Sequence, residues 1–228
     1  MASSGKTKDW NPRCLSQRQR SILIKLAKVI GPLQFYLGGG TAVALYLGHR
    51  RSVDLDWFCP RDFGDPLLLA QRLRELEIPT EILSLDRGTL HANVTGIRVS
   101  FLVYNYPLLK PPNFEKEFSC NIASLDDLGC MKLSAAAQRG SKKDFIDIYA
   151  LVERHKPLLG MFNDFKKKYS TDNLAHVLYG LAYFDDADLE KTPTLLWKTD
   201  WRKIKNRLRE ELKIVTQRLE DGNDMPDS

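Results

Sequence analysis

Two short motifs near the start of the chain combine residue types that could hold a phosphorylated ligand. The first consists of three consecutive glycines, Gly38 to Gly40, followed by Thr41 and an apolar run that favours a helix. Glycines let a phosphate approach the backbone closely, and the start of a helix offers free N–H groups and the positive end of its dipole. The Thr41 hydroxyl adds one more donor. The segment therefore predicts an anion-binding turn.

The second motif is a pair of acidic residues, Asp54 and Asp56, in the segment DLDWF. Alternation of acidic and apolar residues is typical of a strand, and it places both carboxylates on one face, about 6 to 7 Å apart. Carboxylate oxygens at this spacing suit Mg²⁺ held between them and a triphosphate. Together the two motifs predict a metal–nucleotide site.

Each motif also has an ordinary structural interpretation. The glycines alone would be a tight turn, and the two acids alone would be the solvent-facing side of an edge strand. Against the second alternative, the neighbours Leu55, Trp57 and Phe58 indicate an otherwise buried strand. Acidic residues in such a strand need a compensating partner.

The whole stretch GGTAVALYLGHRRSVDLDWF resembles a known signature. GGT followed, after twelve residues, by D-x-D is similar to the motif of the DNA-polymerase-β-type nucleotidyltransferase superfamily, and in particular to its AbiEii/AbiGii abortive-infection toxin branch. The later segment DDLGCMKLSAAAQRGSKKDFIDIYAL extends the resemblance, which covers about residues 20 to 155. It implies an α+β nucleotidyltransferase fold, with a small mixed sheet flanked by helices and a C-terminal helical domain after it.

The resemblance also implies roles for individual residues in moving a nucleoside monophosphate from an NTP to a hydroxyl acceptor. Contacts to the nucleotide phosphates are implied for Gly39, Gly40, Thr41 and Lys132. Mg²⁺ ligands are implied for Asp54 and Asp56. A last motif, in which an acid helps catalysis or completes the site, is matched by Lys143, Asp144 and Asp147. The family further suggests tRNA or another RNA as acceptor and a cognate antitoxin as partner.

Several of these residues have simpler explanations when taken singly. Asp144 fits a capping position of a helix that begins at Ser141, or a surface ion pair, and Lys132 fits a solvent-facing helix position. Arg51 lies between the two motifs and could neutralise triphosphate charge, because arginine suits bidentate phosphate contact. A solvated loop is the alternative for Arg51.

One position departs from the superfamily pattern. A third carboxylate usually comes from a later strand, and Ser100 stands at the corresponding place. Serine can neither supply a charged metal ligand nor act as a strong base. Asp144 or Asp147 is the predicted substitute. Two histidines, His91 and His155, have no partner at metal-binding spacing and receive no role.

The elements that position these motifs follow from apolar periodicity and from glycine and proline breaks. Helices are expected at 16–30, 41–47, 66–77, 124–139, 141–155, 158–168, 173–184 and 200–219. Strands are expected at 35–37, 54–58, 80–85, 89–95 and 97–104, with a proline-marked loop after the last of them. Because strand-like segments stop near residue 120, a nucleotidyltransferase core is expected in 1–120 and a helical domain that completes the site in 121–228.

Composition sets the broad class. The 228 residues are 43% hydrophobic and 28% charged, which is typical of a globular chain. The net charge of +5 is concentrated in the first 30 residues, which carry +6, so the other 198 sum to −1. Four scattered cysteines without a C-x-x-C pair fit a reducing cytoplasm, and no apolar stretch approaches the length of a membrane span. A cytoplasmic enzyme without a membrane partner is therefore expected.

Three functions from different classes remain open at this point. The first is a Mg²⁺-dependent nucleotidyltransferase, acting as the toxin of a toxin–antitoxin pair. The second is an NTP-binding module that Ser100 has left without transfer activity. The third is an interaction protein with a vestigial pocket, in which the basic N-terminal arm and the segment from Trp197 to Arg209 contact a nucleic acid or an acidic antitoxin. Core packing by Trp197 and Trp201 is the structural alternative for that segment.

Overall fold

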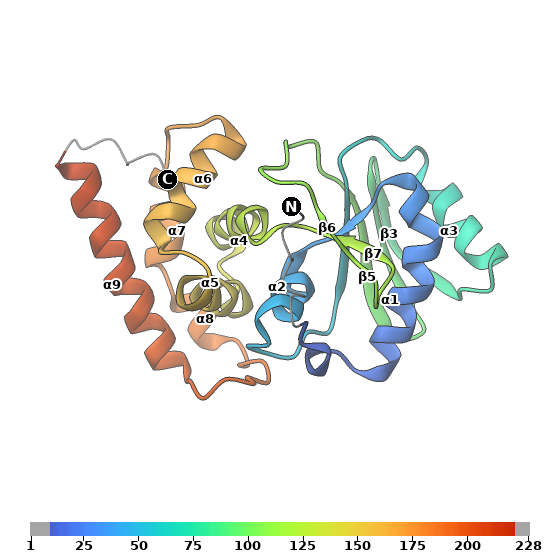
Figure 1. Cartoon of the computed structure of the whole chain (residues 1–228), viewed down its shortest axis with the longest axis horizontal. Coiled ribbons are helices and arrows are strands. Elements are labelled where there is room, and N and C mark those ends of the chain that lie inside the picture. Colours follow the sequence, from blue (N-terminus) through green and yellow to red (C-terminus); the bar gives the residue numbers. More distant parts are fainter. Residues whose placement is uncertain (1–9, 222–228) are drawn as a thin grey trace, which may run out of the picture.

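The computed structural model describes residues 10–221 of the chain. A twisted sheet with helices on both faces forms one half of the molecule, and a group of helices forms the other (Figure 1). The long C-terminal helix lies on the far side of the helical group from the sheet (Figure 1). The predicted class, a mixed sheet flanked by helices and followed by a helical region, is confirmed.

The sheet contains seven strands in the order β3-β4-β5-β2-β1-β7-β6. Their bounds are β1 Tyr36–Leu37, β2 Leu55–Cys59, β3 Thr80–Asp86, β4 Thr89–Val94, β5 Ile97–Val103, β6 Asn113–Glu115 and β7 Cys120–Ile122. β2 runs parallel to β5 and antiparallel to β1, while β3, β4 and β5 form an antiparallel meander. The sheet is therefore mixed, and β2 lies near its centre.

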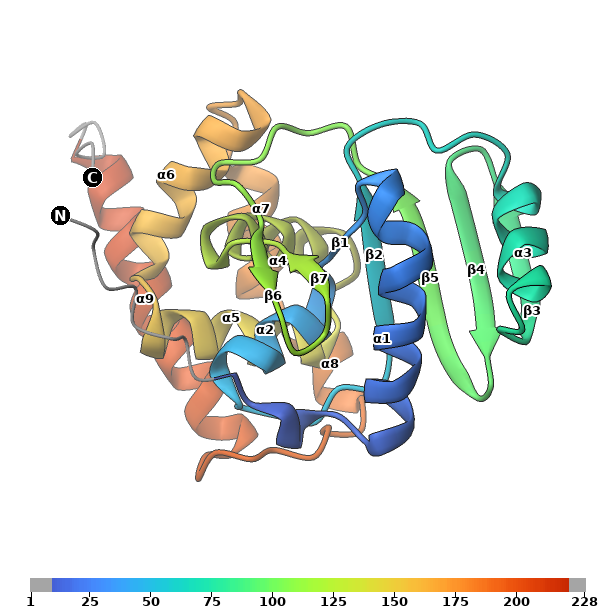
Figure 2. The same cartoon turned by 45° about the vertical axis from the view of Figure 1, so that its right-hand side comes forward.

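Alternation along the strands separates a buried face from an open one. On β4 the apolar residues Leu90, Ala92 and Val94 are buried, whereas the residues between them are half-exposed. α1 (Gln17–Ile30) and α3 (Pro66–Glu75) pack on the buried side, as the view in Figure 2 shows. Ser16 caps α1 with a reciprocal capping box, which fixes where the helix begins.

The opposite face of the sheet holds α2 (Gly39–Leu47), which is apolar on all sides and buried. The helical half follows it with α4 (Leu125–Arg139), α5 (Lys142–Arg154), α6 (Leu158–Tyr169), α7 (Ala175–Ala182), α8 (Asp185–Leu189) and α9 (Trp201–Glu220). Short 3-10 turns occur at Pro12–Cys14 and Gly31–Leu33. α2 contacts both α4 and α5, so it joins the sheet to the helical half.

The expected elements are present, with three additions. Strands β6 and β7 and the five-residue helix α8 were not predicted, because three-residue strands carry no alternation and the prolines before β6 indicated only a loop. The predicted division near residue 120 falls at β7, which pairs in parallel with β1. Residues 1–9 of the basic arm and 222–228 of the acidic tail lie outside the described residues.

No helix among residues 10–221 combines the length and the apolar character needed to cross a membrane.

Candidate active site

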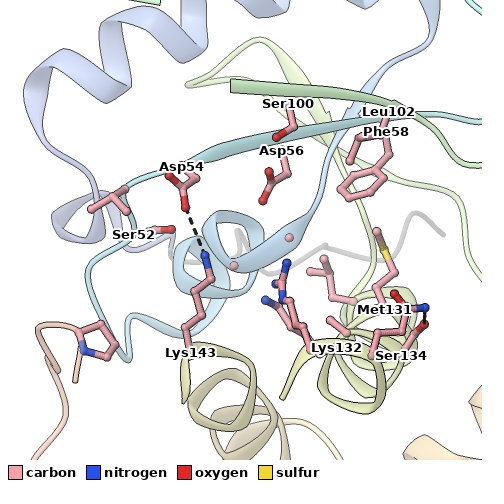
Figure 3. A pocket seen from close by; sticks show the side chains of 18 of the residues that line it. Ser52, Asp54, Asp56, Phe58, Ser100, Leu102, Met131, Lys132, Ser134 and Lys143 are labelled. Carbon is pink, nitrogen blue, oxygen red and sulfur yellow. Dashed lines mark hydrogen bonds and ion pairs between the residues drawn. The ribbon is translucent and has the colours of Figure 1, made fainter. Parts of the chain in front are cut away.

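A cavity of about 840 Å³ lies between the open face of the sheet and the helical half. Its walls come from the start of α2, from β2 and β5, from α4, and from the segment that precedes α9. Figure 3 shows Asp54, Asp56 and Ser100 on the sheet side, with Met131, Lys132 and Ser134 of α4 facing them. The volume is in the range of sites that hold a nucleotide-sized ligand.

The glycine turn occupies the position that an anion site requires. Gly38 donates its N–H to the Asp56 carbonyl oxygen at 2.9 Å, which ties the turn to β2. Gly39, Gly40 and Thr41 then form the first turn of α2, and their N–H groups have no intrahelical acceptor. Gly39 and Gly40 line the cavity. The cavity therefore contains the positive end of a helix.

Gly39 is required by the geometry at this point. Its φ of +60° is in the left-handed region, and a Cβ atom there would collide with the Asp56 carboxylate. We expect Gly39→Ala to lower the free energy of unfolding by about 1 to 2 kcal/mol because of the backbone conformation. Displacement of Asp56 should also reduce transfer about 100-fold.

Urea unfolding and a transfer assay would measure both effects, with Gly160→Ala as the matched control. Gly160 lies in α6 and its added Cβ would make only ordinary contacts with the flexible Lys156 side chain. That control should keep activity and gain up to about 1 kcal/mol from helix propensity. Full activity in Gly39→Ala would contradict the assignment of this glycine.

The two predicted metal ligands lie on the sheet side of the cavity. Asp56 is in β2, whereas Asp54 immediately precedes the strand. The Asp54 side chain is 30% exposed, and Lys143 Nζ lies 3.4 Å from its Oδ2. Burial raises the pKa of the Asp56 carboxyl, and the Lys132 charge and a hydrogen bond from Ser100 oppose this only in part. Among the described residues Asp56 has no ion pair within 4.0 Å, so its charge is poorly balanced.

The Thr41 hydroxyl was expected to face the phosphates, but it makes other contacts in the structure. Its hydroxyl is buried and hydrogen bonds to Ser52 Oγ at 2.7 Å and to the Asp54 carbonyl oxygen. Thr41 is not among the described residues that line the cavity. Its hydroxyl therefore fixes the backbone that carries Asp54, while its N–H remains part of the first turn of α2.

Lys132 is the centre of a buried ion cluster below the cavity. Its Nζ lies 2.9 Å from Asp144 Oδ1 and 2.7 Å from Asp147 Oδ2, and its side chain is only 4% exposed. Arg139 also binds Asp144, at 2.7 Å and 2.9 Å. An ammonium group has three donors, so one N–H of Lys132 remains for a ligand in the cavity.

Asp147 is a second member of the cluster, and its side chain is fully buried. Arg50 binds it with Nε at 2.6 Å and Nη2 at 2.9 Å, and His49 Nε2 donates to Oδ1 at 2.7 Å. Although burial alone would raise the pKa of this carboxyl, the charges of Arg50 and Lys132 hold it well below its ordinary value. Gly40 makes the arrangement possible, because a Cβ there would collide with the Arg50 guanidinium.

The predicted substitutes for a third carboxylate thus lie elsewhere. Neither Asp144 nor Asp147 lines the cavity, and both carboxylates are engaged by cationic side chains. Within residues 10–221 no group of three His, Cys, Asp or Glu side chains is arranged to hold a metal ion. The structure places Asp54 and Asp56 together on the cavity wall, whereas Asp144 binds Lys132 and Arg139, and Asp147 binds Lys132 and Arg50.

Two parts of the cavity wall were not predicted from the sequence. One is aromatic and lies at the end opposite Asp54, where Tyr104 and Tyr169 join their hydroxyls at 2.5 Å and Tyr106 packs on both rings. The Y-x-Y-P pattern contained Tyr104 and Tyr106, but Tyr169 had no local signal. The other is the segment 191–194, which lines the cavity next to Arg51.

Segment 191–194 is held by backbone hydrogen bonds to the loop after α2. The Arg51 N–H donates to Thr194, and the Leu196 N–H donates to His49, at 2.9 Å and 2.8 Å. Trp197 Nε1 donates to the Leu47 carbonyl at 3.2 Å. Trp197 is therefore used to dock this segment, and Trp201 packs against Phe145 and Phe184. These contacts favour the packing interpretation of both tryptophans.

The chain is similar to known proteins in its sequence and in its fold. Residues 21–107 and 98–221 match the family model "Nucleotidyl transferase AbiEii toxin, Type IV TA system". An uncharacterized protein of Aquifex aeolicus is 37% identical over 177 residues, which is 77% of this chain and 85% of that protein.

Two solved structures share the fold. A Helicobacter pylori protein described as a nucleotidyltransferase has a TM-score of 0.54 at 18% identity, covering 92% of this chain and 100% of that one. The nucleotidyltransferase toxin MenT4 of Mycobacterium tuberculosis has a TM-score of 0.52 at 14% identity, covering 90% and 87%. With two family-model matches that span the sheet, the cavity and the helical half, the chain belongs to the AbiEii nucleotidyltransferase toxin family and is a transferase.

Proposed function

We propose that this nucleotidyltransferase uses Mg²⁺ to move a nucleoside monophosphate from an NTP to a hydroxyl group of an RNA acceptor, such as a tRNA. The observation that carries the proposal is the convergence on one cavity of the α2 N-terminus, two carboxylates and Lys132. Each group has a distinct task in transferring a phosphoryl unit, where positioning and charge stabilisation account for most of the catalysis.

The chemistry of the sheet side fits a divalent cation. Asp54 and Asp56 offer hard oxygen donors for a cation. Burial makes the charged form of Asp56 unfavourable, and among the described residues no cationic side chain forms an ion pair with it. The left-handed Gly39 keeps the space beside the Asp56 carboxylate free of a Cβ atom. Mg²⁺ bound by these two residues would stabilise negative charge on the phosphates.

The remaining groups of this chain would bind and orient the nucleotide. The free N–H groups of Gly39 and Gly40 can donate to phosphate oxygens at the floor of the cavity. Lys132, held in place by Asp144 and Asp147, can neutralise the charge of the leaving pyrophosphate. The aromatic wall of Tyr104 and Tyr106 offers a stacking surface for the base.

A transfer assay tests the proposal. Purified protein, each labelled NTP in turn, total tRNA and Mg²⁺ should give labelled RNA with at least one NTP, and EDTA should abolish labelling. Asp54→Asn should reduce the rate about 100-fold because a metal ligand is lost. Asp172→Asn, a change at an aspartate that is 90% exposed, is the matched control and should keep the rate.

Two results would contradict the proposal. Binding of NTP without transfer to any RNA would favour the NTP-binding module instead. RNA binding that falls steeply with salt but needs neither Asp54 nor NTP would favour the interaction protein.

The toxin role with a cognate antitoxin is proposed on the family description. Expression of the chain alone should slow the growth of a host cell, and Asp54→Asn should relieve it at equal protein level. Equal growth arrest by the wild type and by Asp54→Asn would show that toxicity does not depend on transfer.

A further inference from the structure

Three polar side chains form a row across the open face of the sheet. Asp56 of β2 is paired in register with Ser100 of β5, and Ser100 is paired with His91 of β4. Residues paired in register point to the same face, and all three line the cavity. Figure 3 shows the first two of them, Asp56 and Ser100, side by side. His91, which lacks any sequence neighbour at metal-binding spacing, thus reaches the site through strand pairing.

A hydrogen bond joins His91 to Ser100 along this row. His91 Nδ1 lies 3.1 Å from Ser100 Oγ, and a proton on Nδ1 would be donated to that oxygen. A neutral imidazole with its proton on Nδ1 has a free lone pair on Nε2.

The position of His91 suits a base better than a ligand. The described part of the chain holds no cluster in which a third His, Cys, Asp or Glu shares a metal with Asp54 and Asp56. His91 is one strand further from Asp56 than Ser100 is, and its side chain lines the same cavity as both carboxylates. A general base must lie beside the proton that it takes, without itself occupying the reacting position.

We infer that His91 is the general base of the transfer, held by Ser100, and that this pair replaces the carboxylate that Ser100 does not supply. The inference rests on the proposed function. His91 Nε2 takes the proton of the acceptor hydroxyl while the acceptor oxygen forms a bond to the α-phosphorus. The bond from the α-phosphorus to the bridging oxygen breaks, and pyrophosphate leaves with the electron pair. The imidazolium then releases its proton to water.

Charged side chains lie near His91 on the sheet and in the cavity, where Asp54, Lys132, Arg139 and Lys143 also line the wall. On the same face, β3 carries Glu81 and Asp86, β5 carries Arg98 and β2 carries Asp56, while the direct partners of His91 in both neighbouring strands are serines. Glu81 is engaged by Asn93 Nδ2 at 3.2 Å. The directly paired partners of His91 are therefore uncharged.

His91→Gln is the first test variant, and it should fold because His91 is only half buried. We expect kcat to fall about 100-fold or more. NTP affinity, measured by calorimetry, should stay within about threefold. Ser100→Asp in the His91→Gln background should restore part of the rate, because it returns a carboxylate to the position beside Asp56.

Two further measurements separate this inference from the proposed function. Nitrogen-15 NMR of the imidazoles needs no turnover and should show His91 protonated at Nδ1, with that preference weakened in Ser100→Ala. His176→Gln, a change at an exposed histidine on α7, is the matched control and should leave kcat unchanged.

A His91→Gln variant with wild-type kcat overturns the role of His91 and leaves the transfer itself intact. A His91 protonated at Nε2 overturns it as well. Absence of transfer in the wild-type protein with every NTP and RNA overturns the proposed function and this inference together.

Discussion

Asp56→Asn should give a protein that is inactive and more stable than the wild type. Transfer should fall at least 100- to 1,000-fold, since one of the two carboxylates that would hold the metal is lost. The stability gain follows from burial, which raises the pKa of the Asp56 carboxyl, so that its charged form is unfavourable in the folded state. Asparagine has nearly the same shape and carries no charge.

The difference in stability between the wild type and Asp56→Asn should depend on pH. Because the folded-state pKa is raised above the ordinary value of 3.8, the wild type loses stability as the pH rises through the folded-state pKa. The variant has no such loss, so the two proteins should be equally stable in acid and diverge towards neutral pH.

Urea unfolding of metal-free protein at several pH values measures the divergence, and Asp172→Asn should show none. Added Mg²⁺ should stabilise the wild type and not the variant. A variant that is less stable than the wild type at neutral pH, without metal, would contradict the interpretation of Asp56 as a carboxylate kept for ligand binding.

The sequence predicted the parts of the site that depend on local order. The glycine turn, the strand with Asp56 and the helix with Lys132 each follow from residues close together in the chain, and the resemblance to the family set them in order. The helix and strand bounds were right to within a few residues for the same reason. Local capping and glycine signals are sufficient to define such elements.

The contacts that the sequence did not indicate depend on pairing between distant segments. His91 lies beside Ser100 only because β4 and β5 pair in one register, and a shift by one residue would turn it to the buried face. Asp147 reaches Arg50 across 97 residues, which no spacing rule could anticipate. The expectation that Asp144 or Asp147 would replace the third carboxylate came from motif order, which contains no information on side-chain partners.

Asp147→Ala should be the most destabilising of the substitutions considered. Its carboxylate is fully buried and is shared by Arg50, His49 and Lys132, so its removal takes the ion-pair partner from the buried Arg50 and leaves Lys132 with Asp144 alone. Breaking a buried pair in this way costs about 3 to 5 kcal/mol. Transfer should also fall, because Lys132 and the loop of Arg50 lose the group that holds them beside the glycine turn.

The pH dependence again follows from the pKa. Since the folded-state pKa of Asp147 is well below 3.8, its contribution is present at neutral and mildly acidic pH and is lost only in strong acid. The matched control is Glu153→Ala in the same helix, where Glu153 forms an exposed pair with Arg207 at 2.9 Å. Exposed pairs contribute about 0 to 1 kcal/mol. Urea unfolding from pH 4 to pH 8 measures the free energy of unfolding of both variants. The loss for Asp147→Ala should be several times the loss for Glu153→Ala. Equal losses would show that the buried cluster does not hold the site together.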